Sequence, residues 1–374
     1  MKKILSRAGA LFRSQPVLVI AFFAAAATMI AVPPDGKYPG YCNRTVLIEL
    51  FALMAAVAGL RSIGVFDAAT KYILQKTGNL RNLGRVLILI CFFSAMFVTN
   101  DVALITFVPL TLLVYRDIPD EKSRILTIVL ETAAANMGSM MTPIGNPQNL
   151  FIYDEFGLTA GDFVKTMLPA GSVSLVCLML LSFMLPASPC SAPAAADVKI
   201  QKGKASVYTA LFALCLTAVF RLVPDYFCLI GAIAAALICD ISLLKKVDYA
   251  LLATFVCFFV FVGNIARIDA VSEFFSRILS GRELLVSVGL SQVISNVPAA
   301  VMLAGFTDKG KALLLGVNIG GLGTIIASLA SLISFQFYRK AEGAKPGKYM
   351  LAFTAVSIAM LAVLLPFELI IQSL

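Results

Sequence analysis

The chain has 374 residues, of which 60% are hydrophobic and only 14% are charged. Because a soluble domain is typically about 25% charged, this composition excludes an ordinary soluble protein. The sequence has no histidine, which excludes Ser-His and Cys-His dyads and histidine zinc sites, and it has no ATP-binding P-loop. We therefore expect a membrane protein that is not an enzyme.

Apolar segments follow one another along the whole chain. The first comes after a basic stretch and resembles a signal peptide, but its length and the many later spans favour an uncleaved first span. The segments lie at 16–32, 44–60, 84–115, 123–153, 163–186, 206–222, 226–244, 248–264, 283–306, 310–338 and 349–372.

Two segments are interrupted by polar residues. Segment 84–115 contains Thr99-Asn100-Asp101, and segment 283–306 contains Ser295-Asn296. Each arm has about 10 to 15 residues and reaches roughly 15–23 Å, which is short of the ~30 Å needed to cross the bilayer. We therefore predict two re-entrant helical hairpins, which are tolerated where they are buried in protein or line an aqueous cavity.

Two further segments have the composition of broken transmembrane helices. Glycine, proline and asparagine gather in the middle of 123–153 and of 310–338, and they interrupt a helix by removing backbone bonds and restraint. Before each predicted hairpin lies a more polar stretch, 65–82 or 265–282, which we expect to form a helix at the membrane interface. Residues 187–205 are rich in Pro, Ala and Ser and form the expected cytoplasmic linker.

The order of polar helix, hairpin, broken span and full span occurs twice, in 1–186 and in 206–374. The broken spans share the pattern N-x-G-x-x-x-T-x-I-[GA]-[NS]-x-x-[NS]-L. Its aligned pairs are Asn136 and Asn318, Gly138 and Gly320, Thr142 and Thr324, Ile144 and Ile326, Gly145 and Ala327, Asn146 and Ser328, Asn149 and Ser331, and Leu150 and Leu332.

Counting crossings gives the two repeats opposite orientations. With the N-terminus in the cytoplasm, the first hairpin enters from the cytoplasm and the second from outside, as in transporters built from inverted repeats. The net charge of +9 lies mostly in the loops that this topology places in the cytoplasm, so we interpret it as an orientation signal and not as a nucleic-acid surface. The prediction is an all-α polytopic protein of the cell (inner) membrane.

The polar breaks carry the chemistry of a transport site. Thr99 or Ser295, each followed by Asn, is typical of a helix N-cap, and Asn146-Pro147 repeats this pattern. Facing helix starts favour a bound anion, whereas free carbonyls and side-chain oxygens at the end of the preceding half-helix suit Na⁺. The residues assigned to substrate binding are Thr99, Asn100, Asn146, Ser295, Asn296 and Thr324. Those assigned to the coupling ion are Asp101, Asn136, Gly138, Thr142, Asn318 and Gly320.

Asp101 is the sharpest single candidate, because a carboxylate at membrane depth is costly and usually functional. It would carry a coupling proton or help to bind Na⁺. The alternative is an acid stabilised by the dipole at a helix start. Glu131 is a second acid within an apolar span. It would either take part in coupling or lie near the membrane interface.

These motifs resemble the ion transporter superfamily, which includes divalent-anion/sodium symporters, citrate transporters and arsenite permeases. The resemblance runs from about residue 44 to the end and rests on 97–104 with Pro109, 142–149, 295–298 and 318–321. In the symporters, each tip has a Ser-Asn-Thr triplet that meets substrate carboxylates. Asp101 and Val297 stand here in place of the Thr. The resemblance also implies an elevator-type motion and a homodimer.

The sequence thus predicts a secondary active transporter for a small anion, a carboxylate or an oxyanion, coupled to Na⁺ or H⁺. Two alternatives on the same scaffold are a sodium/proton antiporter and an arsenite-type efflux permease. No cofactor is expected beyond Na⁺ as a candidate coupling ion. The expected partners are the small anion, the lipid bilayer and a second copy of the chain, without nucleic acid.

Overall fold

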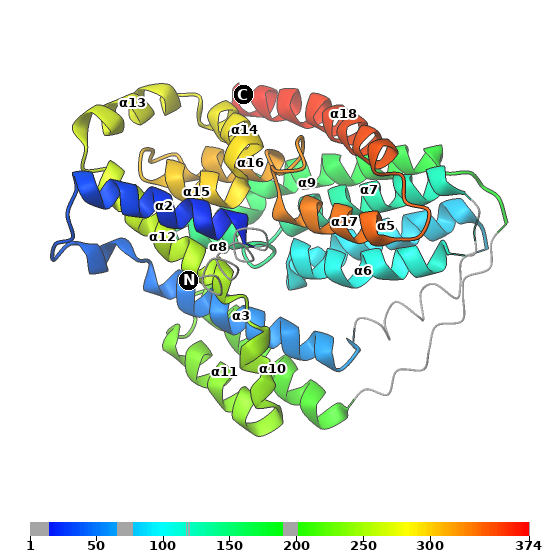
Figure 1. The fold of residues 1–374 in the computed structure, drawn as a ribbon, viewed down its shortest axis with the longest axis horizontal. Helices are drawn as coiled ribbons and strands as arrows, with labels where there is room; N and C mark the ends of the chain where they lie inside the picture. The colour runs from blue at the N-terminus through cyan, green and yellow to red at the C-terminus, as the bar shows by residue number, and fades with distance from the viewer. Residues whose placement is uncertain (1–14, 66–77, 117, 119, 190–200, 374) are drawn as a thin grey trace, which may run out of the picture.

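The computed structural model describes residues 15–65, 78–116, 118, 120–189 and 201–373. Within these ranges the chain folds almost entirely into helices, and its one bridge of β type joins Asn79 to Pro189. The protein is all-α, as its composition predicts (Figure 1).

The first half begins with an apolar helix and ends with the long helix before the linker. Its elements are α2 (Pro16–Ala31), η1 (Tyr38–Tyr41), α3 (Arg44–Ser62), α5 (Leu80–Val98), α6 (Asn100–Val114), α7 (Glu121–Ser139), α8 (Pro147–Glu155), α9 (Ala160–Leu181) and η2 (Ser182–Met184). The predicted interfacial helix at 65–82 falls mostly outside the described residues, as does much of the linker.

The second half begins inside the expected linker, because α10 already starts at Lys202. Its elements are α10 (Lys202–Val219), α11 (Tyr226–Cys239), η3 (Ile241–Lys246), α12 (Tyr249–Ile265), α13 (Asp269–Leu279), α14 (Glu283–Ile294), α15 (Asn296–Ala304), α16 (Gly310–Ile319), α17 (Leu329–Lys340) and α18 (Pro346–Ser373). The apolar segment 226–244 is not one helix as expected: α11 ends before Asp240, whose carboxylate accepts the Ser242 N–H at 2.9 Å and begins η3.

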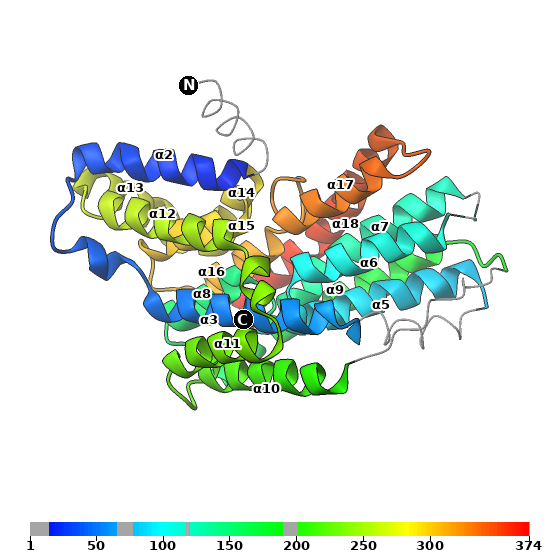
Figure 2. The same cartoon turned by 60° about the horizontal axis from the view of Figure 1, so that its bottom comes forward.

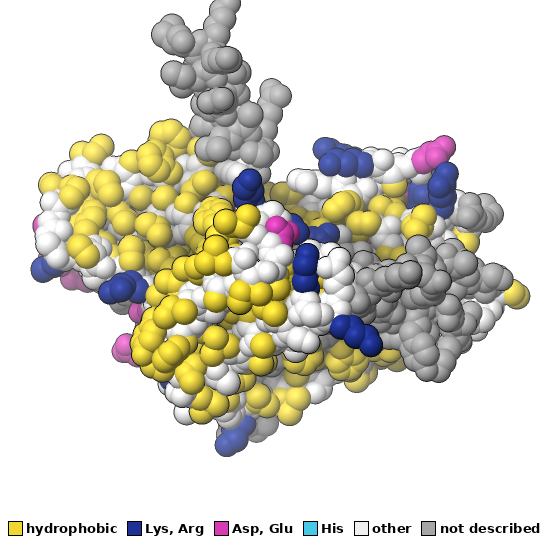
Figure 3. Space-filling model, turned by 90° about the horizontal axis from the view of Figure 1, so that it is seen from below, with side chains coloured by type: hydrophobic (Ala, Val, Ile, Leu, Met, Phe, Trp, Pro, Cys, Tyr) yellow, Lys and Arg dark blue, Asp and Glu magenta, His cyan; other side chains and the backbone are white. Residues whose placement is uncertain are grey.

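Four helices among the described residues are long and apolar enough to cross a membrane: α3, α5, α9 and α18. A fifth span results if α12 and α13, which meet at 103°, are counted together. Several apolar helices, among them α6, α14 and α16, are shorter. The first arm of the predicted hairpin at 84–115 is longer than expected, because α5 already starts at Leu80 and has 19 residues. The surface formed by α10 and α11 is broadly apolar (Figure 3), with Leu237 and Ile238 exposed, and suits contact with lipid.

In Figures 1 and 2, α10 and α11 lie against α3, while α5, α6 and α7 lie side by side in another part of the molecule. We define two groups of helices around α3 and α7. The α3 group consists of α2, α3, α10, α11 and α12, and the α7 group consists of α5 to α9 and α14 to α18. Helix α12 packs mainly on α2, and it contacts α15 of the α7 group more than it contacts α3. The other main contact between the groups is that of α3 with α8. The arms α5 and α6 pack on each other, as do α14 and α15.

One face of the molecule gathers the loop between α8 and α9 and the segments around it. Asn43 Nδ2 donates to Asp154 at 2.7 Å, and Arg221 donates to the carbonyl of Tyr153 at 3.0 Å. Lys311 pairs with Asp162 at 2.7 Å on the same side. We call this side the Asp154 face, and the topology counted from the sequence assigns its segments to one side of the membrane.

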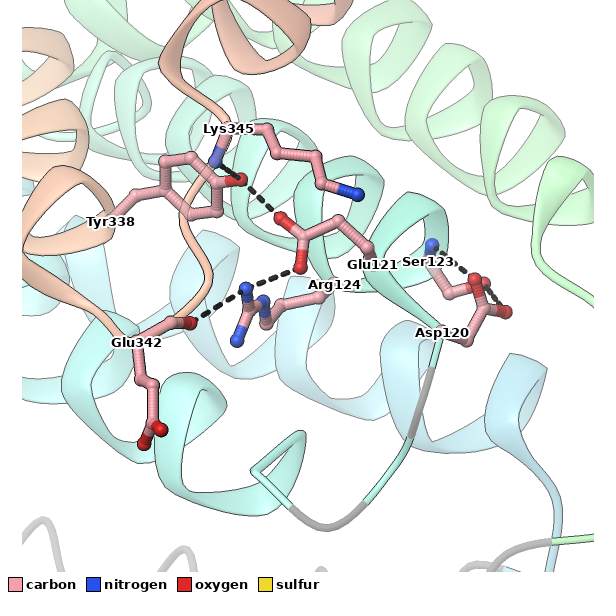
Figure 4. A network of polar contacts seen from close by, with 7 residues as sticks. All are labelled: Asp120, Glu121, Ser123, Arg124, Tyr338, Glu342 and Lys345. Atoms are coloured by element: carbon pink, nitrogen blue, oxygen red, sulfur yellow. Dashed lines mark hydrogen bonds and ion pairs between the residues drawn. The ribbon is translucent and has the colours of Figure 1, made fainter.

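The opposite side, which we call the Glu121 face, joins the start of α7 to the end of α17. Figure 4 shows Glu121 accepting hydrogen bonds from Tyr338 and Arg124, while Arg124 also donates to the carbonyl of Glu342 at 3.2 Å. The Lys345 N–H donates to the Tyr338 hydroxyl at 2.8 Å. The same topology assigns these segments to the other side of the membrane.

Candidate functional site

Both predicted hairpin tips have an unusual backbone. Thr99 has φ 72° and ψ 150°, and Ser295 has φ 76° and ψ 156°. Residues other than glycine rarely adopt this region, at a cost of roughly 1–3 kcal/mol each, and such strain is found mostly at functional sites. Two helix breaks that match in sequence therefore share one strained conformation.

The asparagine after each tip is buried and bonded in the same way. The Asn100 N–H donates to the Gly145 carbonyl at 3.2 Å, and the Asn296 N–H donates to the Ala327 carbonyl at 2.9 Å. Gly145 and Ala327 are aligned partners in the internal repeat. Each tip is thus anchored to the broken helix of its own half at an equivalent carbonyl.

The expected capping by Thr99 and Ser295 is wrong. Both occupy the N-cap position, but neither side chain accepts a capping hydrogen bond. The second amide of each helix is instead bound by the asparagine that starts the helix. Asn100 Oδ1 accepts the Asp101 N–H, and Asn296 Oδ1 accepts the Val297 N–H, both at 3.0 Å.

The N-cap predicted at Asn146 is confirmed. Its Oδ1 accepts the Asn149 N–H at 3.0 Å, and Pro147 begins α8. Ser328, the aligned residue before α17, makes no capping bond. Its hydroxyl donates instead to Asn136 Oδ1, at 2.9 Å.

Asn136 binds the broken helix of the other half. Besides the bond from Ser328, its Oδ1 accepts Asn100 Nδ2 at 3.0 Å, and its Nδ2 donates to the Ser331 hydroxyl at 3.2 Å. The end of α7 is thereby joined both to the first tip and to the start of α17.

Asn318, the aligned partner of Asn136, makes the reciprocal contacts. Its Oδ1 accepts Asn146 Nδ2 at 3.1 Å, and its Nδ2 donates to Asn149 Oδ1 at 2.6 Å. Asn146 and Asn149 align with Ser328 and Ser331. In each half, the asparagine before the helix break bonds to the two aligned residues after the break of the other half. We call these buried side chains, Asn136 with Ser328 and Ser331, and Asn318 with Asn146 and Asn149, the crosswise junction.

Two threonines tie the breaks to the hairpin arms. The Thr142 hydroxyl donates to the Met96 carbonyl, and the Thr324 hydroxyl donates to the Gln292 carbonyl at 3.0 Å. Each of these carbonyls lies three residues before its tip. Thr324 is exposed, whereas the other residues assigned to substrate binding are buried or half-buried.

The carbonyls expected to be free at the helix ends are already occupied. Those of Gly138 and Asn318 accept backbone N–H groups at 3.0 Å, and that of Gly320 accepts Gln292 Nε2 at 2.8 Å. The two backbone bonds tighten the last turns, as is common at helix ends, whereas the bond from Gln292 comes from α14. Gly138 is also a packing position, because a Cβ there would lie 2.0 Å from the Phe92 carbonyl oxygen.

A cavity of about 660 Å³ lies between the two helix groups. Of the predicted site residues, it is lined by Thr99, Asp101 and Asn146, whereas the asparagines at 100, 136 and 318 lie behind its wall. The starts of α6, α8 and α17 all border it. The structure therefore brings part of the predicted site together around one open space.

Three charged residues of this cavity were missed by sequence reasoning. Arg61, Lys246 and Asp248 line it, and Asp248 also caps α12 by accepting the Leu251 N–H at 3.0 Å. The sequence places these residues at the ends of spans, but only the packing of α3 and α12 against the α7 group turns them toward the tip.

Glu131 is buried away from the cavity. Its Oε1 accepts the Thr111 hydroxyl at 2.6 Å, and its Oε2 has no hydrogen-bond partner. The Glu131 side chain therefore lies inside the α7 group and is bonded to Thr111. Among the described residues, no group of three or more Cys, Asp or Glu side chains is placed to hold a metal ion.

The apolar spans, the paired helix breaks and the cavity between two helix groups define a polytopic membrane transporter. The family model described as "Citrate transporter" matches residues 8–308, so the chain belongs to the citrate transporter family. An uncharacterized transporter of Methanocaldococcus jannaschii is 32% identical over 325 residues, which cover 86% of this chain and 88% of that protein.

Two further similarities agree with this assignment. The inner membrane protein YbiR of Escherichia coli is 31% identical over 313 residues, covering 80% of this chain and 81% of that protein. The crystal structure of the YdaH transporter of Alcanivorax borkumensis, described as having an unusual topology, matches with a TM-score of 0.58 at 15% identity. It covers 90% of this chain and 86% of that one, and it supports the fold alone.

Proposed function

We propose that the chain is a secondary active transporter that moves a small anion, a carboxylate or an oxyanion, coupled to Na⁺ or H⁺. The observation that carries this proposal is the meeting of three helix starts, those of α6, α8 and α17, at one cavity. A helix start carries about half a positive charge. The amides of Asn100 and Asp101 in α6 and of Asn149 in α8 are already hydrogen-bonded within the protein, so it is the helix dipoles that would attract the anion. Arg61 and Lys246 add two full positive charges to the same walls.

The acids of the cavity suit the coupling ion. Asp101 stands at the first tip and Asp248 at the start of α12, so each helix group contributes one carboxylate. A cavity with charges of both signs suits an anion and a cation that bind together, because each offsets the repulsion that the other meets. We assign Asp101 to the cation and the helix starts to the anion.

The arrangement of the helices supports the inverted repeats and constrains the elevator-type motion. The crosswise junction pairs equivalent residues, as a pseudo-two-fold axis between repeats requires. A sliding motion of one group along the other would have to change the contacts of α3 with α8 and of α12 with α15. Arg61, which lines the cavity, lies at the end of α3 remote from the Asp154 face, so we assign the opening of the cavity to the Glu121 face. With the N-terminus in the cytoplasm, that face is cytoplasmic.

The proposal predicts that the right anion stabilises the purified protein. A ligand that binds the folded state raises its stability by RT ln(1 + [L]/Kd), about 2.7 kcal/mol at one hundred times Kd. Thermal unfolding would be followed across a panel of carboxylates and oxyanions in Na⁺ or K⁺ at equal ionic strength. We expect one class of anion to raise Tm, and the rise to grow with Na⁺ or with acid. A panel without any effect would remove the proposal.

A sodium/proton antiporter is the second candidate, favoured by the two acids that share the cavity. It would move protons in response to Na⁺ without any anion. In proteoliposomes that contain a pH-sensitive dye, Asp101→Asn should then abolish the Na⁺-driven signal. Unchanged exchange in that variant would count against Asp101 as the exchanging acid.

A further inference from the structure

A second cavity, of about 570 Å³, lies at the Asp154 face and shares no lining residue with the first. Its walls come from the loop after α8, the first turns of α9, the start of α16 and the last turns of α18. The volume falls in the range of small-molecule pockets, about 300–1,000 Å³. None of its residues belongs to the transport site described above.

One buried acid in this cavity has an unsatisfied oxygen. Glu368 of α18 is only 1% exposed, and its Oε1 has no hydrogen-bond partner. An unpaired buried carboxyl oxygen is costly, typically about 1–3 kcal/mol and more when it is charged. Since Glu368 lines the cavity, a ligand with N–H donors would satisfy it from the open side.

Apart from Glu368, the cavity is lined by more basic than acidic side chains. Lys165, Lys309 and Lys311 line it together with one further acid, Asp308. Lys311 is paired with Asp162, and Lys309 lies 3.9 Å from Glu283. The cavity also contains the start of α16, which has no capping side chain. A phosphate is the group that a helix start and lysines bind together.

The surroundings of the cavity point to lipid. Val164 and Leu168 of α9 and Leu369 and Ile371 of α18 are exposed apolar residues beside it. Phe156 and Leu315 give its interior an apolar wall. An occupant must therefore combine a positive donor, a phosphate and a hydrocarbon chain.

We propose that this cavity binds an aminophospholipid, with its primary ammonium on Glu368 and its phosphate between Lys165, Lys309 and the start of α16. A metal ion fits less well, because it offers the three lysines no negative group. A choline headgroup also fits less well, because a quaternary ammonium has no N–H to give to Glu368 Oε1.

The test is thermal unfolding of the delipidated full-length protein with added phosphatidylethanolamine or phosphatidylcholine of the same chains. Phosphatidylethanolamine should raise Tm with an apparent Kd at least about ten-fold lower than that of phosphatidylcholine. This ratio corresponds to about 1.4 kcal/mol. Water-soluble glycerophosphoethanolamine should have a much smaller effect at the same concentration, because it lacks the chains.

Glu368→Gln keeps the shape of the side chain and removes its charge. This variant should fold, and its affinity for phosphatidylethanolamine should fall to that for phosphatidylcholine. Glu273→Gln, which removes an exposed acid on α13, should leave the difference between the two lipids intact. Lys165→Gln with Lys309→Gln should weaken the binding of both lipids.

Three results would overturn the proposal. The first is an equal effect of the two lipids on the wild-type protein. The second is a preference for phosphatidylethanolamine that survives in Glu368→Gln, which would leave Glu368 as a neutral buried acid without a ligand. The third is an equal effect of the soluble headgroup, which would make the site one for a free amine phosphate.

Discussion

A Gly138→Ala protein is expected to lose roughly 3 kcal/mol or more of its free energy of unfolding, the upper range for overpacking a close contact. The added Cβ would lie 2.0 Å from the backbone oxygen of Phe92 and 2.7 Å from its carbonyl carbon. Because these are backbone atoms, α5 and α7 must separate to admit the methyl group. Thermal unfolding of the purified variant in detergent measures the loss.

Gly289→Ala is the matched control. Gly289 also lies inside a helix, α14, but a Cβ there would meet nothing within 4 Å. This substitution should leave stability unchanged or raise it by up to ~1 kcal/mol, since alanine is the better helix former. A Gly138→Ala protein as stable as Gly289→Ala would show that α5 and α7 do not pack as closely as described.

Asn136→Ala is expected to lower both stability and transport. It removes three hydrogen bonds and leaves Asn100, Ser328 and Ser331 buried without them. At about 1–3 kcal/mol for each buried group left unpaired, the loss should reach about 3 kcal/mol. Because Asn100 begins α6 at the tip, we also expect transport to fall by roughly 100-fold, as misplacement by about 1 Å costs in enzyme sites.

Two comparisons make this prediction specific. Asn318→Ala, which breaks the reciprocal bonds to Asn146 and Asn149, should give a similar loss. Asn82→Ala, at an exposed position in the first turn of α5, should have little effect. Normal transport by Asn136→Ala in an otherwise stable protein would remove the crosswise junction from the mechanism.

Much of the fold follows from the sequence because each break carries a local signal. Thr99-Asn100 and Ser295-Asn296 interrupt apolar runs, and helices end at these residues in the structure. The order of the helices follows from the same apolar runs. The element boundaries inside 226–244 were missed because the hydrophobic character continues past Asp240, and only its side-chain bond begins a new turn.

The contacts between the halves could not be predicted. The internal alignment pairs Asn136 with Asn318 and Asn149 with Ser331, but it does not say which residues touch. A periodic pattern reports the face of a helix and not its neighbour. The hydrogen bonds from Asn136 and Asn318 to the opposite half depend on the angles at which α7, α8, α16 and α17 cross.

The cavity was predictable only in part. The sequence indicates Thr99, Asp101 and Asn146 because polar residues at membrane depth are energetically costly and usually have a function. Arg61 and Lys246 carry no such signal, since basic residues at the ends of spans are ordinary orientation signals. Their place on the cavity wall comes from tertiary packing of the α3 group against the tip.

The most direct test of the transport proposal is uptake of a labelled anion into proteoliposomes that contain the purified protein and an imposed Na⁺ or H⁺ gradient. We expect the anion that raises Tm to accumulate inside against its own gradient. Collapse of the ion gradient and the Asp101→Asn substitution should each stop that accumulation. Accumulation that persists without any cation gradient would contradict the coupled mechanism, and continued Na⁺/H⁺ exchange with no anion uptake would establish the antiporter instead.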